Sequence, residues 1–166
     1  MESLGSLLEE RGVETNRSLS GRAGIRTGRV GCIFCDIAAK KLTAHVVFED
    51  DVALAFLDKS PLFVGHVLVV PRSHVVTLPE LPAESIGPFF ERVQSIARAM
   101  PKALGAQGTF VAMNNIVSQS VAHLHVHVVP RTKGDGLKGF FWPRTKYKSD
   151  DQMHETAEKI RPLIGV

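Results

Sequence analysis

Apolar residues follow regular spacings along most of the chain beyond residue 30. Apolar, β-branched runs are typical of strands, whereas the spacings of three and four between Ile86 and Met100 predict a helix. The strands predicted in this way are Val46–Glu49, Val52–Leu57, Val64–Val70, Thr109–Met113 and Ala122–Pro130. The predicted helices are Ile33–Lys41, Glu80–Ala103 and Asp150–Arg161. Few crossover helices separate the strands, so the order predicts an α+β fold: an antiparallel sheet with one long helix and a short C-terminal helix.

Residues 1–30 lack this periodicity. They mix arginines and glutamates with Gly, Ser and Thr, and show only a weak apolar spacing at Leu4, Leu7 and Leu8. We expect a disordered N-terminal extension, with a short helix or a misassigned start codon as alternatives. The folded domain is expected to occupy residues 31–166.

The composition fits one globular domain: 166 residues, 44% of them hydrophobic and 22% charged. The 20 basic and 17 acidic residues give a net charge of +3 without a basic stripe. A nucleic-acid partner is therefore disfavoured, whereas an anionic small molecule fits. No apolar run approaches the roughly 20 residues of a membrane span, and the N-terminus has no secretory signal pattern. We expect a cytoplasmic protein that does not enter a membrane.

Cys32 and Cys35 are the two cysteines of the chain and form a single C-x-x-C pattern. Cysteines this close in sequence cannot staple a fold, so they indicate half of a metal site or a redox pair. A redox pair of the thioredoxin type would sit in a βαβ pattern, which the surrounding sequence lacks.

The run His123-Leu-His125-Val-His127 places three histidines at alternate positions of a predicted strand. Because strand side chains alternate between faces, the imidazoles are expected on one face, about 7 Å apart, and Leu124, Val126 and Val128 on the core face. Imidazoles this close cannot all be protonated cheaply. Some are therefore expected to be neutral near pH 7, and available as nucleophile, hydrogen-bond acceptor or metal ligand.

This run fits the signature of the histidine-triad (HIT) family, and further motifs extend the resemblance over residues 31–130. The matching segments are Cys32–Cys35, Phe48–Asp51, Ala55–Asp58, Gly65–His74 and Asn114–Val121. The chain thus resembles the zinc-containing, bacterial-type branch of HIT nucleotide hydrolases and transferases. The loop before the triad is shorter than the common family version and has Ser118 where glycine is usual.

The resemblance implies catalytic roles for four residues. His125 matches the nucleophile, which attacks the α-phosphorus and splits one difficult displacement into two easier ones. His127 would contact the phosphate or the leaving group, and Ser120 matches a hydroxyl near the leaving group. His66 matches a supporting histidine, with a buried strand-end residue as the alternative.

A nucleotide site is implied by six further positions. Phe34, Ile37 and Phe56 resemble an apolar base pocket, although such residues also form cores. Asp58 resembles the ribose-binding aspartate, with a turn residue as its alternative. Asn115 and Gln119 resemble phosphate-loop residues, with a simple turn as the alternative at Asn114-Asn115.

A structural zinc site is implied by the same resemblance. Zinc-containing relatives add the histidine after the central strand and the first triad histidine to the cysteine pair; here these are His74 and His123. Cys32, Cys35, His74 and His123 would form a closed set of four ligands with no position left for substrate. The alternative is a relic pair in a chain that keeps the fold without zinc.

The expected function is hydrolysis of a phosphoanhydride or phosphoramidate bond to a nucleoside monophosphate, through a covalent nucleotidyl-histidine. Dinucleoside polyphosphates and adenosine phosphoramidates are the candidate substrates, and a purine nucleotide is the expected ligand. The family also implies a homodimer with a shared sheet. The alternatives are a nucleotidyltransferase or phosphorylase, and a nucleotide-binding regulator with little turnover.

Overall fold

The computed structural model describes residues 31–137 and 146–163, so the predicted extension 1–30 lies outside the described residues. The strands are β1 (Val46–Glu49), β2 (Ala53–Leu57), β3 (Val67–Pro71), β4 (Gly108–Ala112) and β5 (Val126–Arg131). The helices are α1 (Ile33–Ala38), α2 (Ala83–Leu104) and α3 (Asp150–Ile160), with short 3-10 turns η1 (Leu78–Glu80) and η2 (Arg161–Leu163).

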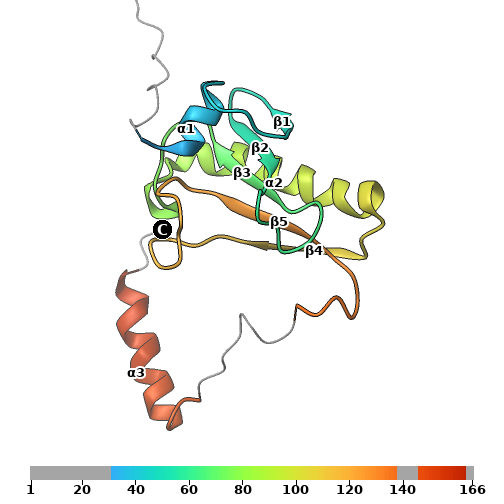
Figure 1. Cartoon of the computed structure of the whole chain (residues 1–166). Coiled ribbons are helices and arrows are strands. Elements are labelled where there is room, and N and C mark those ends of the chain that lie inside the picture. The colour runs from blue at the N-terminus through green and yellow to red at the C-terminus, as the bar shows by residue number, and fades with distance from the viewer. Residues whose placement is uncertain (1–30, 138–145, 164–166) are drawn as a thin grey trace, which may run out of the picture.

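The five strands form one antiparallel sheet in the order β1-β2-β3-β5-β4. Figure 1 shows the long helix α2 lying along the sheet, while α3 stands apart from it. The predicted α+β class, with a long helix and a short C-terminal helix, is confirmed. None of the described helices has the length and apolarity needed to cross a bilayer.

Strand alternation divides the interior into two clusters. Ala53 and Ala55 of β2 join Val67 and Val69 of β3 in a core that includes Phe89 of α2. The alternate residues of β2 and β3 face the other way and pack against α1 and the residue before it. This second cluster consists of Cys32, Phe34, Cys35, Ile37, Leu54, Phe56, Leu68 and Val70. The face away from α2 is therefore left for α1 and the histidines.

Helix α2 turns one apolar stripe toward the sheet. Its buried residues are Phe89, Val93, Ile96 and Met100, at the spacing of three and four that predicted it. The helix ends at Gly105, which adopts the left-handed conformation (φ 66°) that favours glycine after a helix. Arg92 of α2 also pairs with Asp50 of the β1–β2 turn at 2.9 Å, which fixes the hairpin against the helix.

The predicted strand Ala122–Pro130 begins too early, because β5 starts only at Val126. The backbone N–H of Leu124 donates to the carbonyl of Val75, outside the sheet, and β3 pairs with β5 only from Val126 onward. The predicted strand Val64–Val70 also begins too early, because β3 starts only at Val67. Gly65, with φ 94°, turns the chain just before it. The ring centroids of His125 and His127 lie 5.0 Å apart, closer than the 7 Å expected from the strand rise.

Candidate functional site

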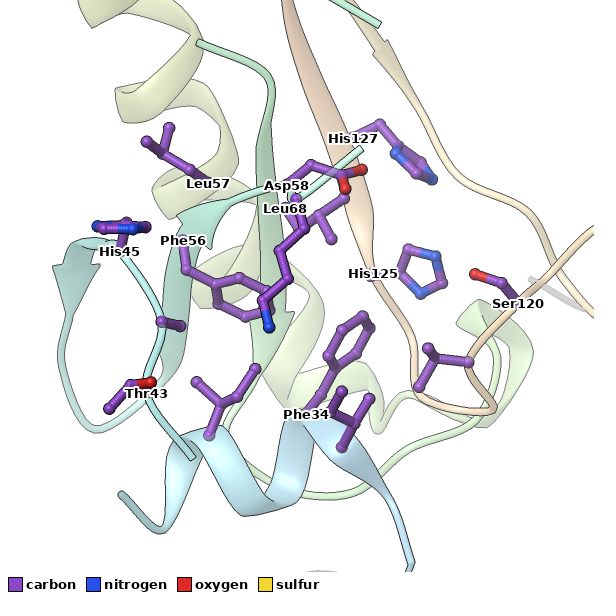
Figure 2. Close-up of a pocket in the computed structure, with 15 residues that line it drawn as sticks. Phe34, Thr43, His45, Phe56, Leu57, Asp58, Leu68, Ser120, His125 and His127 are labelled. Atoms are coloured by element: carbon purple, nitrogen blue, oxygen red, sulfur yellow. The ribbon is translucent and has the colours of Figure 1, made fainter. Parts of the chain in front are cut away.

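A pocket of about 370 Å³ opens on the α1 side of the sheet. The strand row Phe56–Leu68–His127, paired across β2, β3 and β5, contributes one wall. Figure 2 shows Phe34 and Phe56 between the histidines His125 and His127 on one side and Thr43 and His45 on the other. The predicted site residues that line it are Phe34, Ile37, Phe56, Asp58, Ser120, His125 and His127. The pocket thus has an apolar half and a half rich in imidazole and hydroxyl groups.

The backbone fixes the tautomer of His125. Its Nδ1 lies 2.7 Å from the carbonyl oxygen of His123, and a carbonyl oxygen only accepts. Nδ1 therefore carries the proton, and Nε2 keeps its lone pair. Because the side chain lines the pocket, this lone pair is available to an electrophile held there.

A second chain of bonds fixes His66 and His127. The N–H of Leu62 donates to Nδ1 of His66 at 3.2 Å, so the proton of a neutral His66 resides on Nε2. That nitrogen lies 2.9 Å from Nδ1 of His127 and donates to it. His127 is thereby left with its proton on Nε2. In this site His125 therefore has a free lone pair on Nε2, and His127 has an N–H on Nε2 that can donate a hydrogen bond.

Burial keeps the imidazoles of His66 and His127 neutral. Desolvation lowers the pKa of His127 to about 4, assisted by the neighbouring His125 and His66. Desolvation also lowers the pKa of His66, and the nearby Asp58 opposes this only in part. Asp58 lies 3.5 Å from Nδ1 of His66, but the Leu62 bond requires a lone pair on that nitrogen. We therefore treat His66 as neutral near pH 7.

Phe34 connects the pocket to the cysteine segment. Its ring centroid lies 5.4 Å from those of Phe56 and His125, and 6.0 Å from that of His123. All of these contacts are edge-on, an arrangement favoured by the aromatic quadrupole. Since Phe34 lies between Cys32 and Cys35 in sequence, any ion held by the cysteines also constrains the pocket wall.

Four predicted metal ligands come together beside the pocket. One ligand atom from each of Cys32, Cys35, His74 and His123 lies within 4.8 Å of the others. Nδ1 of His123 lies 3.4 Å from Sγ of Cys32 and 3.6 Å from Sγ of Cys35, and Nδ1 of His74 lies 3.2 Å from Sγ of Cys35. Tetrahedral zinc, with bonds of about 2.3 Å to sulfur and 2.0 Å to nitrogen, implies S···N edges of about 3.5 Å.

The orientation of His123 also fits a metal. Its Nε2 donates to the carbonyl of Pro71 at 2.9 Å, which leaves a lone pair on the Nδ1 that faces the thiols. Burial lowers the pKa of His123 to about 4, so the ring is neutral as a ligand must be. The four residues therefore fit zinc, and as a closed Cys₂His₂ set they favour a structural rather than a catalytic ion.

Of the predicted catalytic and nucleotide-binding residues, His66, Asn115 and Gln119 do not line the pocket; His66 reaches it only through His127. Oδ1 of Asn115 accepts from the N–H of Leu78 at 2.7 Å. Gln119 accepts from the N–H of Ile116 and donates to the carbonyl of Val76, both at 2.7 Å. Both amides thus contact backbone groups. The roles that the resemblance assigns to these and the other site residues stay predictions.

Beyond the apolar lining residues Ile33, Ala44, Leu57, Leu68 and Val121, the sequence reasoning missed three polar ones: Thr43, His45 and Lys59. No motif surrounds His45 in the sequence. All three are exposed side chains in segments flanking the first hairpin, and no pattern distinguishes them from solvated positions. Lys59 directly follows Asp58, and this was the one signal that could have drawn attention to it.

Comparisons with known proteins agree with this geometry. The profile of the HIT domain family matches residues 39–134, more than half of the chain. The chain belongs to the HIT family. An uncharacterised HIT-like protein of Methanocaldococcus jannaschii is 40% identical over 107 residues, covering 63% of this chain and 82% of the relative.

Two HIT relatives carry named activities. An adenosine 5'-monophosphoramidase of Schizosaccharomyces pombe is 34% identical over 137 residues, covering 81% of this chain and 99% of the relative. An adenylylsulfatase of Arabidopsis thaliana is 33% identical over 119 residues, covering 70% of this chain and 60% of the relative.

Solved HIT structures share the fold. A Bacillus subtilis member superposes with a TM-score of 0.71 at 33% identity, over 82% of this chain and 99% of that one. A zinc-bound Mycobacterium smegmatis member gives a TM-score of 0.62 at 33% identity, over 80% of this chain and 95% of that one. A zinc-bound structure in the same family is compatible with the Cys₂His₂ cluster of this chain.

Proposed function

We propose that this HIT protein is a hydrolase that releases a nucleoside monophosphate from a phosphoramidate or phosphoanhydride substrate, through a covalent nucleotidyl intermediate on His125. The observation that carries the proposal is the 2.7 Å bond from Nδ1 of His125 to the carbonyl of His123, which leaves Nε2 as a nucleophile in the pocket. Two relatives, named as an adenosine 5'-monophosphoramidase and an adenylylsulfatase, support an adenylyl group as the transferred unit.

The first half-reaction uses both fixed tautomers. Nε2 of His125 forms a bond to the α-phosphorus while the bond from phosphorus to the leaving nitrogen or oxygen breaks. Nε2–H of His127 donates a hydrogen bond to the leaving atom, which departs with a proton from solvent, and Ser120 donates a second hydrogen bond near it. His66 serves His127 by holding its Nδ1 at 2.9 Å.

Hydrolysis then releases the nucleotide from the intermediate. Water attacks the phosphorus of the nucleotidyl-histidine and releases a proton to solvent, while the bond to His125 breaks and restores the free imidazole. The base is held against Phe34, Ile37 and Phe56. The carboxylate of Asp58, 21% exposed in its side chain, accepts from the ribose hydroxyls.

Zinc, when bound by Cys32, Cys35, His74 and His123, supplies structural cross-linking of α1 to the segment after β3. The four residues orient the pocket wall through Phe34 and the nucleophile through the backbone of His123. A homodimer that shares the sheet and a cytoplasmic location belong to the same proposal.

The test compares hydrolysis of an adenosine phosphoramidate and of diadenosine tetraphosphate side by side. His125→Ala is the active-site variant, and His154→Ala, an exposed histidine on α3, is the matched control. We expect turnover by the parent protein and by His154→Ala, none by His125→Ala, and AMP binding by all three. Preference for one substrate assigns the class. AMP binding without turnover by the parent protein would instead support a nucleotide-binding regulator.

A further inference from the structure

Asn115 and Gln119 lie in the loop before the triad, and their side-chain amides bond to backbone. Nε2 of Gln119 donates to the carbonyl of Val76, and its Oε1 accepts from the N–H of Ile116. Oδ1 of Asn115 accepts from the N–H of Leu78. All three bonds are 2.7 Å long. We refer to these two residues as the amide clamp, because they join the loop to residues 76–78.

The loop needs such a clamp for its conformation. Ile116 (φ 70°) and Ser118 (φ 60°) adopt left-handed backbone angles, which are strained for residues other than glycine. The side chains of Ile116 and Val117 are 77% and 78% exposed, so apolar burial offsets little of this strain. Hydrogen bonds therefore hold this shape: some lie within the loop, from Asn114 and the backbone, and those of the clamp join the loop to residues 76–78.

The two segments that the clamp joins both lead into the site. Ser120 follows Gln119 directly, lines the pocket, and presents its hydroxyl on the His125 side in Figure 2. On the other side, Val76 lies two residues after the metal-ligand candidate His74, and Val75 accepts from the N–H of Leu124 at 2.6 Å. The clamp thus links the position of Ser120 to the backbone that carries the triad.

We propose that Gln119 is a positioning residue for Ser120, supported by Asn115, and that it acts through the loop rather than by contact with the nucleotide. The inference rests on the proposed function, in which the Ser120 hydroxyl hydrogen-bonds near the leaving atom. One N–H of the Gln119 amide donates to Val76 and its oxygen accepts from Ile116, so the backbone fixes the orientation of this side chain, which does not line the pocket. A displaced hydroxyl would slow the reaction most when the leaving group is poor.

A double-mutant cycle separates the two roles. Gln119→Ala, Ser120→Ala and the double variant are compared on adenosine phosphoramidates with an alkylamine and with a better, arylamine leaving group. We expect Gln119→Ala to lower kcat/KM about tenfold to a hundredfold for the alkylamine and less for the arylamine. When Ser120 is already alanine, adding Gln119→Ala should change kcat/KM less than twofold. The affinity for AMP should be the same in all variants of the cycle.

Additive losses across the cycle, or a tenfold weaker AMP affinity in Gln119→Ala, would overturn the proposal, because a direct phosphate contact predicts both. Gln119→Glu keeps the acceptor for Ile116 but loses the donor to Val76, and we expect it to behave as Gln119→Ala. The matched control is Gln107→Ala, which removes a similar amide bond, 2.7 Å to the N–H of Lys133, outside the pocket lining. Its kinetics should match those of the parent protein.

Amide hydrogen exchange tests the hydrogen bonds of the clamp independently of catalytic activity. The amide protons of Ile116 and Leu78 should exchange slowly in the parent chain, and that of Ile116 at least tenfold faster in Gln119→Ala. Rapid exchange of both protons in the parent chain would overturn the clamp itself. If the parent chain binds AMP but hydrolyses neither substrate, the proposed function fails along with the part of the inference that concerns Ser120, while exchange still decides on the clamp.

Discussion

The nucleophile candidate His125 is oriented by the backbone of the metal-ligand candidate His123. Nδ1 of His125 donates to the carbonyl oxygen of His123 at 2.7 Å, while the ring of His123 faces the thiols of Cys32 and Cys35. Phe34, which lies between those cysteines in sequence, contacts both imidazole rings. The candidate metal ligands and the pocket therefore share a backbone carbonyl and an aromatic ring, and each constrains the other.

Removal of the metal should weaken nucleotide binding. His74→Ala deletes a ligand candidate that bonds to Cys35 and does not line the pocket, so a change in the pocket reports the loss of the ion. We expect lower zinc content and an AMP dissociation constant about tenfold higher, within the usual range of coupling between sites. Metal analysis and titration calorimetry test this. AMP affinity unchanged in metal-free protein would show that the two sites are independent.

The half-buried His127 should make the free energy of unfolding depend on pH in one window. Its pKa is about 4 in the folded chain against an ordinary value of 6.5, so between these values the unfolded chain binds a proton that the folded chain does not. The free energy of unfolding should therefore fall as pH drops from 6.5 to 4, and stay level above 6.5. Allowing for solvent screening of a partly exposed ring, His127 should account for about 1–2 kcal/mol of that fall. Urea unfolding of the parent chain and of His127→Gln measures the contribution, and parallel pH profiles would refute it.

Asp58 should recognise the ribose. Its Oδ1 is fixed by the N–H of Ser60 at 2.9 Å, and the carboxylate lines the pocket. Asp58→Asn keeps the shape and removes the charge that strengthens bonds from hydroxyl donors. We expect about tenfold weaker binding of AMP, and a much smaller change for the 2',3'-dideoxy analogue. Equal losses for both nucleotides would assign Asp58 to another part of the ligand.

Phe89 should be the most costly single truncation on α2. Its side chain is fully buried between the helix and the sheet, so Phe89→Ala leaves a cavity and should lower the free energy of unfolding by about 3–5 kcal/mol. Ile86→Ala on the same helix, at a site that is 42% exposed, serves as the control and should cost less than about 1 kcal/mol. Denaturant unfolding of both variants checks the difference.

The elements were predictable from local periodicity because burial repeats along each element. The spacing of Phe89, Val93, Ile96 and Met100 marks the face of α2 that the structure buries. The start of β5 was not predictable, because it depends on the bond from Leu124 to Val75, a contact between segments far apart in sequence.

The features of the site also divide into those that the sequence predicts and those that it does not. Residues within motifs, such as Asp58 and His125, were found by pattern and lie in the pocket. The bond from Leu62 that sets the tautomer of His66, and the backbone bonds of Gln119, have no sequence signature. His45 lines the pocket from an exposed segment that precedes β1, so only the fold reveals it.

The most direct test of the central claim is the chemical identity of the intermediate. The parent protein, mixed with an adenosine phosphoramidate and quenched within one turnover under conditions that preserve phosphoramidates, is digested and mapped by mass spectrometry. We predict an adenylyl group on the peptide that holds His125, formed and lost at rates consistent with turnover and absent from His125→Ala. Turnover without an adduct, or an adduct on another residue, would contradict the account.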